Sequence, residues 1–150
     1  MKILFDTSII VEIDRHNSSV IKALKEWTEE GHELLVSTIT VSEILTGSYL
    51  RKDINVSVLT AKEILNQFIW HEINGETAEK AAKLFSYLII EKKLESIEYP
   101  DVLIGASFLS SGSDALITLN KKDFMILPGL KDKVFTIEEF MARDKHKKDK

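Results

Sequence analysis

Short apolar segments alternate with segments of helical periodicity along the whole chain. The short segments are typical of strands and occupy residues 2–6, 34–37, 69–73, 115–118 and 134–136. Between them, apolar residues recur every three or four positions, as in Val20, Leu24 and Trp27. Strands that alternate with helices pair in parallel through right-handed crossovers. We therefore predict an α/β fold with a central parallel sheet of four to five strands flanked by helices.

The length and composition indicate one domain with a sizeable core. The 150 residues are 44% hydrophobic and 29% charged, an ordinary globular balance. There is no cysteine, which excludes disulfides, a cysteine nucleophile and a thiolate zinc site. The polar stretch 48–58 breaks the helical periodicity. We place the domain at residues 1–142 and expect residues 143–150, which are charged and lack apolar anchors, to be a flexible tail.

The N-terminus and the charge balance predict where such a chain works. The first apolar run is short and reaches an aspartate at position 6, so it lacks the features of a secretory signal. No apolar stretch approaches the roughly 20 residues that span a bilayer. We expect a cytoplasmic protein without a membrane partner. Twenty basic and 24 acidic residues give a net charge of −4, which argues against broad nonspecific binding of nucleic acid.

Four acidic residues lie where predicted buried segments give way to other structure. Asp6 ends the first strand, Glu43 lies in the helix after the second, and Asp123 follows the strand at 115–118. Asp101 begins a helix directly after a proline. Ligands of open α/β sheets bind beyond the carboxyl ends of the strands, so these four side chains can meet there. Their mutual repulsion then calls for a divalent cation.

The chemistry of such a cluster divides the four acids into two pairs. Mg²⁺ keeps several waters and usually takes one or two carboxylates directly. We expect Asp6 and Asp101 to contact the ion, and Glu43 and Asp123 to contact it directly or through water. Without the ion, at least one acid of the cluster should have a raised pKa. The short polar side chains beside the acids are predicted to orient them by hydrogen bonds; they are Thr7, Ser8, Thr118 and Asn120.

Four sequence pieces, in this order and spacing, resemble the PIN-domain nucleases and among them the VapC-type toxins. They are the segments 5–8 (FDTS), 41–45 (VSEIL), 100–106 (PDVLIGA) and 118–124 (TLNKKDF). The resemblance extends from residue 2 to about residue 140. It implies a single PIN-like domain in which Asp6, Glu43, Asp101 and Asp123 are the catalytic acids.

The resemblance also implies an activity and partners. Proteins of this kind are Mg²⁺- or Mn²⁺-dependent endoribonucleases, VapC-type toxins are inhibited by a cognate antitoxin that covers the acidic crevice, and they commonly form homodimers. The expected substrate is RNA. The polar stretch at residues 52–57 and the lysine-rich tail match no family feature, which leaves the RNA target and the antitoxin open.

Each acid alone has a simpler explanation, and other functions compete. An isolated Asp6 or Asp101 is usually a helix N-cap, and Glu43 alone is a solvated helix residue. A haloacid-dehalogenase-type phosphatase needs an acid two residues after its first Asp, where this chain has Ser8. A receiver domain distributes its acids differently. An RNA-processing PIN nuclease and a PIN-like binding module that no longer cuts remain as alternatives.

Lysines and histidines give weaker predictions. Lys121 and Lys122 lie beside the predicted site and are candidates for phosphate contact, although lysine pairs are usually solvated. The four histidines show no His-x-x-x-His spacing and no partner acid that would make a zinc site, so we expect surface or boundary positions for them.

Overall fold

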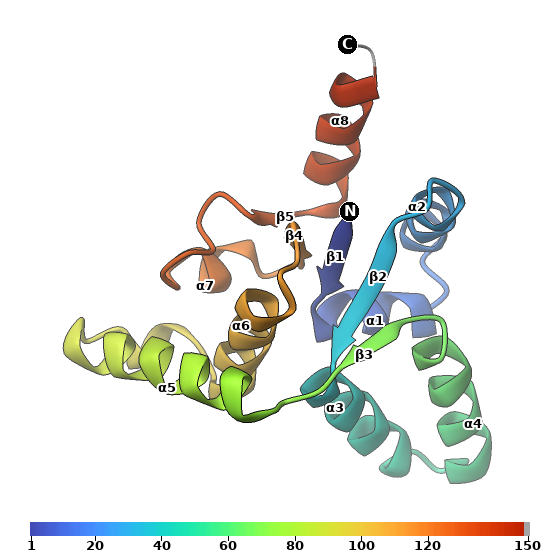
Figure 1. Cartoon of the computed structure of the whole chain (residues 1–150). Helices are drawn as coiled ribbons and strands as arrows, with labels where there is room; N and C mark the ends of the chain where they lie inside the picture. The colour runs from blue at the N-terminus through green and yellow to red at the C-terminus, as the bar shows by residue number, and fades with distance from the viewer. Residues whose placement is uncertain (149–150) are drawn as a thin grey trace.

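A five-stranded parallel sheet lies at the centre of the structure, a computed structural model that describes residues 1–148 (Figure 1). The strand order is β3-β2-β1-β4-β5, and each neighbouring pair is parallel. The strands are β1 (Lys2–Phe5), β2 (Glu33–Ser37), β3 (Ile69–His71), β4 (Ala115–Ile117) and β5 (Val134–Phe135). The predicted α/β class and parallel sheet are confirmed, with five strands.

The central strand β1 is apolar on both sides because both faces of the sheet are covered. Ile3, Leu4 and Phe5 are fully buried. Successive side chains of a strand point to opposite faces, and Ile3 and Phe5 accordingly pack in one core cluster while Leu4 packs in the other. A continuous apolar run is therefore what this position requires. The run ends where the strand ends, and Asp6 is the first polar residue after it.

Helices cover the two faces of the sheet. One face packs against α1 (Thr7–Asp14), α2 (Ser18–Glu29), α4 (Ile54–Leu65) and the first part of α8 (Ile137–Lys148). The other packs against α5 (Gly75–Ile90), α6 (Tyr99–Ser111) and the region of α7 (Lys121–Met125). Helix α3 (Thr38–Tyr49) contacts α4 and α6, and a short 3₁₀ turn, η1 (Leu94–Ser96), precedes α6. No helix among residues 1–148 combines the length and the apolar character needed to cross a membrane.

The strand register brings the carboxyl ends of the strands to one edge of the sheet. Phe5 is paired with Val36 of β2 on one side and with Ile117 of β4 on the other. The next backbone amide, that of Asp6, donates a hydrogen bond to the carbonyl of Ile117 at 3.0 Å. The residues that follow β1, β2 and β4 are therefore neighbours in space, although more than a hundred positions separate the first from the last.

The polar stretch 48–58 is more helical than its sequence pattern predicts. Helix α3 continues to Tyr49, and α4 already begins at Ile54. The first turn of α4 is hard to recognise because Ile54 is 44% exposed and Val56 is 66% exposed, so the buried stripe of this helix starts only at Val58. Residues 52 and 53 of the segment 52–57 thus belong to the loop between α3 and α4, and its other residues form the first turn of α4.

The boundary predicted between residues 142 and 143 falls inside a helix. Helix α8 continues through Lys148, and Asp144 is only 7% exposed. Residues 149 and 150, the last two of the predicted tail, lie outside the described part of the chain.

One glycine allows α6 to pack closely against the segment after α7. A Cβ atom at Gly105 would lie 2.6 Å from the Cδ1 atom of Leu127, well inside van der Waals contact. We expect Gly105→Val to lower the free energy of unfolding by about 1–3 kcal/mol, as overpacking of a core does. Urea denaturation of the purified protein measures this change.

Gly47 provides the matched control, because it lies inside α3 with no atom within 4 Å of its Cβ position. Gly47→Ala should raise the free energy of unfolding by about 0.5–1 kcal/mol through helix propensity alone. Wild-type stability of Gly105→Val would show that the contact at Gly105 is not tight.

Candidate active site

A polar cavity of about 580 Å³ opens at the carboxyl edge of the sheet. Its walls come from α1, α3, η1, the start of α6 and the region of α7. Thirteen residues line it; none is a lysine or an arginine, and six are carboxylic acids: Asp6, Glu43, Glu95, Glu98, Asp101 and Asp123. The structure therefore brings the four acids predicted from the sequence into one cavity and adds two more.

Asp6 is the most firmly held of these acids. It is 2% exposed and caps α1, accepting a hydrogen bond on Oδ1 from the backbone amide of Thr7 at 2.7 Å. Its Oδ2 accepts from the hydroxyl of Ser8 at 2.7 Å and from that of Thr118 at 2.8 Å. A carboxylate that accepts from three donors keeps one orientation. Asp6 thus caps α1 and also lines the cavity.

The hydroxyls that hold Asp6 are themselves held by backbone groups. Ser8 Oγ accepts from the backbone amide of Leu119 at 3.1 Å, and Thr118 Oγ1 accepts from that of Asn120 at 2.9 Å. The chain just after β4 is thereby tied to the start of α1. Of the residues predicted to orient the acids, Thr7, Ser8 and Thr118 contact them, whereas Asn120 lines the cavity and acts through its backbone amide.

Glu43 reaches the cavity from the second turn of α3. The hydroxyl of Thr7 donates to its Oε2 at 2.5 Å, and the same hydroxyl oxygen lies 3.0 Å from Oγ1 of Thr40. Helix α3 starts directly after β2, where Ser37 caps it by accepting from the amide of Ile39. The direct passage from strand to helix sets the position of Glu43 relative to Asp6.

Asp101 is the acid whose charge is most strongly disfavoured. It lies in the first turn of α6 and is half-buried. Burial raises its pKa to about 7, and repulsion from Asp6, Glu43, Glu98 and Asp123 contributes to the same pKa shift, in decreasing order. The expectation that a metal-free cluster contains an acid with a raised pKa is met at this residue. Neutral pH therefore leaves Asp101 partly protonated.

Asp123 completes the predicted quartet from the first turn of α7. Its backbone amide donates to the carbonyl of Asn120 at 3.1 Å. The neighbouring Lys121 and Lys122 do not line the cavity. Lys121 instead contacts both carboxylate oxygens of Glu139 at 2.8 Å, which leaves Lys122 as the more available cation of the pair.

Two acids of the cavity escaped the sequence prediction. Glu98 is the N-cap residue of α6 without a side-chain capping bond, and Glu95 lies in η1. Both belong to an irregular segment, so no strand end or helical stripe marks them. Their only indication is position, since Glu98 comes three residues before Asp101, one helical turn earlier.

The sequence matches the PIN domain family over residues 3–127, a range that contains all four predicted acids. The chain therefore belongs to the PIN domain family. A comparison with curated proteins finds no match.

Solved structures with the same fold include toxin–antitoxin complexes. VapBC2 from Rickettsia felis, bound to a promoter DNA fragment, has a TM-score of 0.81 at 20% identity, covering 91% of this chain and 98% of that chain. DNA-bound VapBC from Salmonella typhimurium has a TM-score of 0.81 at 16% identity with the same coverages. A toxin–antitoxin complex from Klebsiella pneumoniae has a TM-score of 0.65 at 28% identity, covering 89% and 96%. The predicted resemblance to VapC-type PIN domains is confirmed.

The raised pKa of Asp101 predicts how stability depends on pH in metal-free buffer. The pKa is about 7 in the folded protein and about 4 in the unfolded chain, so the folded state binds this proton more tightly. The free energy of unfolding should therefore fall as pH rises from about 4 to about 7. After allowance for solvent screening of a half-exposed group, we expect this contribution to be about 1–2 kcal/mol.

Asp101→Asn should remove this contribution and be more stable than wild type at pH 7.5. Urea denaturation with EDTA at pH 5 and pH 7.5 measures both effects. Asp132→Asn, at an exposed position outside the cavity, is the control and should keep the wild-type dependence. An unchanged pH dependence in Asp101→Asn would assign the effect to another group.

Proposed function

We propose that this chain is a Mg²⁺- or Mn²⁺-dependent endoribonuclease and the toxin of a VapBC-type toxin–antitoxin pair. One observation carries the proposal: carboxylates from four distant segments meet in a cavity without lysine or arginine, at the carboxyl edge of a parallel sheet. The raised pKa of Asp101 supports it, because burial first and then repulsion from four neighbouring acids disfavour its charge, and no lysine or arginine lines the cavity to offset them. PIN family membership supports the type of reaction.

The donor set fits a hard divalent cation. Carboxylate oxygens are the ligands that Mg²⁺ and Mn²⁺ prefer, and Asp6 and Asp101 are our first choice for direct contact. Glu43 and Asp123 would contact the ion directly or hold its water. When bound, such an ion would activate water for attack on a phosphodiester and offset charge on the leaving oxygen.

The residues of this chain would contribute orientation and charge. Asp6 presents a charged carboxylate in one fixed rotamer, because three donors hold it. Thr7 holds Glu43 in the same way through a single short hydrogen bond. Asp101 would lose its proton as the cation binds, since a neighbouring positive charge favours the ionised carboxylate and offsets the effect of burial. Activity should accordingly decline at acidic pH.

Binding of an RNA substrate requires that the electrostatic potential of the cavity change from negative to positive. Six carboxylates with no lysine or arginine among the lining residues would repel a polyanion. Bound cations reverse that repulsion locally, which explains how a chain of net charge −4 could bind RNA only at its site. Lys122, which is exposed, is the candidate for an additional phosphate contact.

A cognate antitoxin and a second copy of the chain are the proposed protein partners. The structural matches from VapBC complexes support an antitoxin. Large apolar side chains are exposed at two places that partners could cover. The first lies at the α3–α4 junction and comprises Tyr49, Leu50, Ile54, Val56 and Leu59. The second lies between the end of α5 and the start of α6 and comprises Ile89, Ile90, Leu94 and Tyr99.

Cleavage by purified protein tests the activity. With Mg²⁺ or Mn²⁺, wild type should cleave RNA and EDTA should stop it, whereas Asp6→Asn and Asp101→Asn should each be slower by more than about 100-fold through loss of a metal ligand. The matched substitution Asp132→Asn should cleave at the wild-type rate. Chelator-resistant cleavage would refute metal dependence, and absence of cleavage across single-stranded and structured RNAs would favour the non-cutting alternative.

Growth of a host cell tests the toxin role. Induced expression of the chain should arrest growth, and co-expression of the product of a small adjacent gene should restore it by covering the cavity. Asp101→Asn should be harmless at equal protein level, which immunoblotting verifies. Normal growth under wild-type expression, combined with RNA cleavage in vitro, would instead indicate an RNA-processing nuclease.

A further inference from the structure

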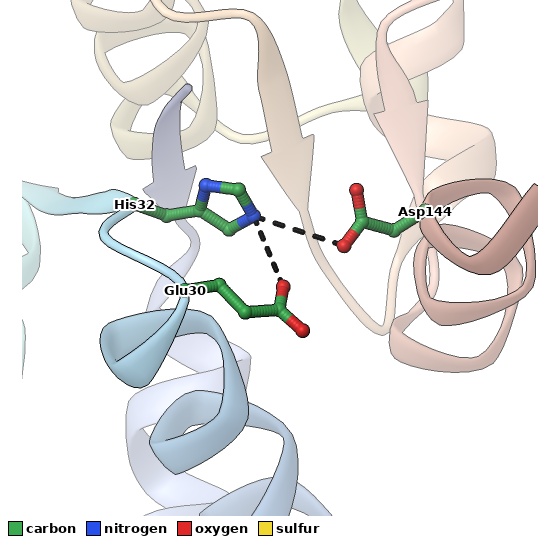
Figure 2. A group of neighbouring side chains, drawn as sticks. All are labelled: Glu30, His32 and Asp144. Atoms are coloured by element: carbon green, nitrogen blue, oxygen red, sulfur yellow. Dashed lines mark ion pairs between the residues drawn. The ribbon is translucent and has the colours of Figure 1, made fainter. Parts of the chain in front are cut away.

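A second group of potential metal ligands lies at the opposite edge of the sheet from the acidic cavity. His32 lies in the turn between α2 and β2, Glu30 is the C-cap residue of α2, and Asp144 comes from α8 (Figure 2). Each offers one ligand atom, and the three atoms lie within 4.8 Å of one another. Met1 and the start of β2 are at this edge too, since the amide of Glu33 donates to the carbonyl of Met1.

The His32 ring points one nitrogen into this group without a hydrogen bond. Its side chain is 11% exposed, and its buried Nε2 atom has no hydrogen-bond partner among the described residues. The nearest carboxylate oxygens, on Glu30 and Asp144, are 3.4 Å and 3.7 Å away, beyond the usual N–H···O range of about 2.7–3.2 Å (Figure 2). Nε2 of His32 and the two carboxylate oxygens are too far apart for good hydrogen bonds, and an ion that contacts all three atoms could lie among them.

The two separations that involve His32 are close to those around a tetrahedral metal ion. Nitrogen and oxygen ligands lie about 2.0–2.2 Å from Zn²⁺, which places neighbouring ligands about 3.3–3.6 Å apart. The 3.4 Å separation of His32 and Glu30 falls in this range, and the 3.7 Å separation of His32 and Asp144 exceeds it slightly.

We propose that His32, Glu30 and Asp144 bind a divalent transition-metal ion, with Zn²⁺ as the best fit. Imidazole with two carboxylates suits Zn²⁺, whereas Mg²⁺ and Ca²⁺ take oxygen ligands. Two carboxylates also balance the charge of the ion, and three protein ligands leave one position for water. The proposal is independent of the nuclease function, because it uses none of the residues of the acidic cavity.

The ion would join segments that are far apart in the sequence. Helix α8 packs against α2 and β5, and Asp144, which is buried, lies in the second half of this helix. On the other side of the ring, Nδ1 of His32 lies 3.3 Å from the N-terminal nitrogen. The first and last parts of the chain would thus be held together.

Metal titration of a cavity-disabled protein tests the site. The host is the full chain carrying Asp6→Asn and Asp101→Asn, and the probes are Zn²⁺ in calorimetry and Co²⁺ in visible absorption. We expect one equivalent to bind, with the absorption bands of Co²⁺ bound to nitrogen and oxygen ligands, and Zn²⁺ to raise the midpoint of thermal unfolding. His32→Gln or Asp144→Asn in this host should weaken binding at least tenfold and remove the thermal shift.

His16→Asn is the matched control, because His16 is exposed and has a positive φ of 59° that asparagine tolerates. It should bind metal like the host. If His32→Gln fails to fold by circular dichroism, Glu30→Gln replaces it, since Glu30 is exposed. Absence of binding to the host, or undiminished binding after loss of His32 or Glu30, would overturn the proposal and leave an ion-paired histidine only.

Discussion

Repulsion between carboxylates, confined by the geometry of a parallel sheet, is the constraint on which the site depends. The register of β1, β2 and β4 places the residues that follow them at one edge, whatever their chemistry. In this chain those positions and the adjoining helix starts carry acids. The sheet prevents the acids from moving apart, so burial and, after it, repulsion from the neighbouring acids raise the pKa of Asp101 in the folded protein.

The hydrogen bonds around Asp6 hold one of these acids in place and also join parts of the fold. Ser8 and Thr118 bridge the start of α1 and the end of β4, and each also accepts a backbone hydrogen bond. The same contacts therefore close the sheet edge and orient an acid. A buried polar network that is fully satisfied gives one defined arrangement, which a binding site for a small ion requires.

The fold and the four acids could be predicted from the sequence for specific physical reasons. A strand covered on both faces reads as a continuous apolar run, as Ile3, Leu4 and Phe5 do, and the first acid after such a run marks the sheet edge. Glu98 was missed because the segment before α6 has no periodicity from which its path could be derived. The group around His32 was missed because Asp144 is 112 positions away and lies beyond the domain boundary that composition suggested. In both cases the contact depends on tertiary packing, which local patterns do not record.

The position of β1 in the middle of the sheet has a consequence for biosynthesis. Strand β1 can complete its pairing only after β4 has been synthesised, and the carboxylate of Asp6 accepts one of its hydrogen bonds from Thr118. Contacts of such long sequence separation form late. A nascent or prematurely terminated chain that stops before β4 has no sheet edge at which the acids could meet. The cavity therefore forms only after β4 has been synthesised and paired.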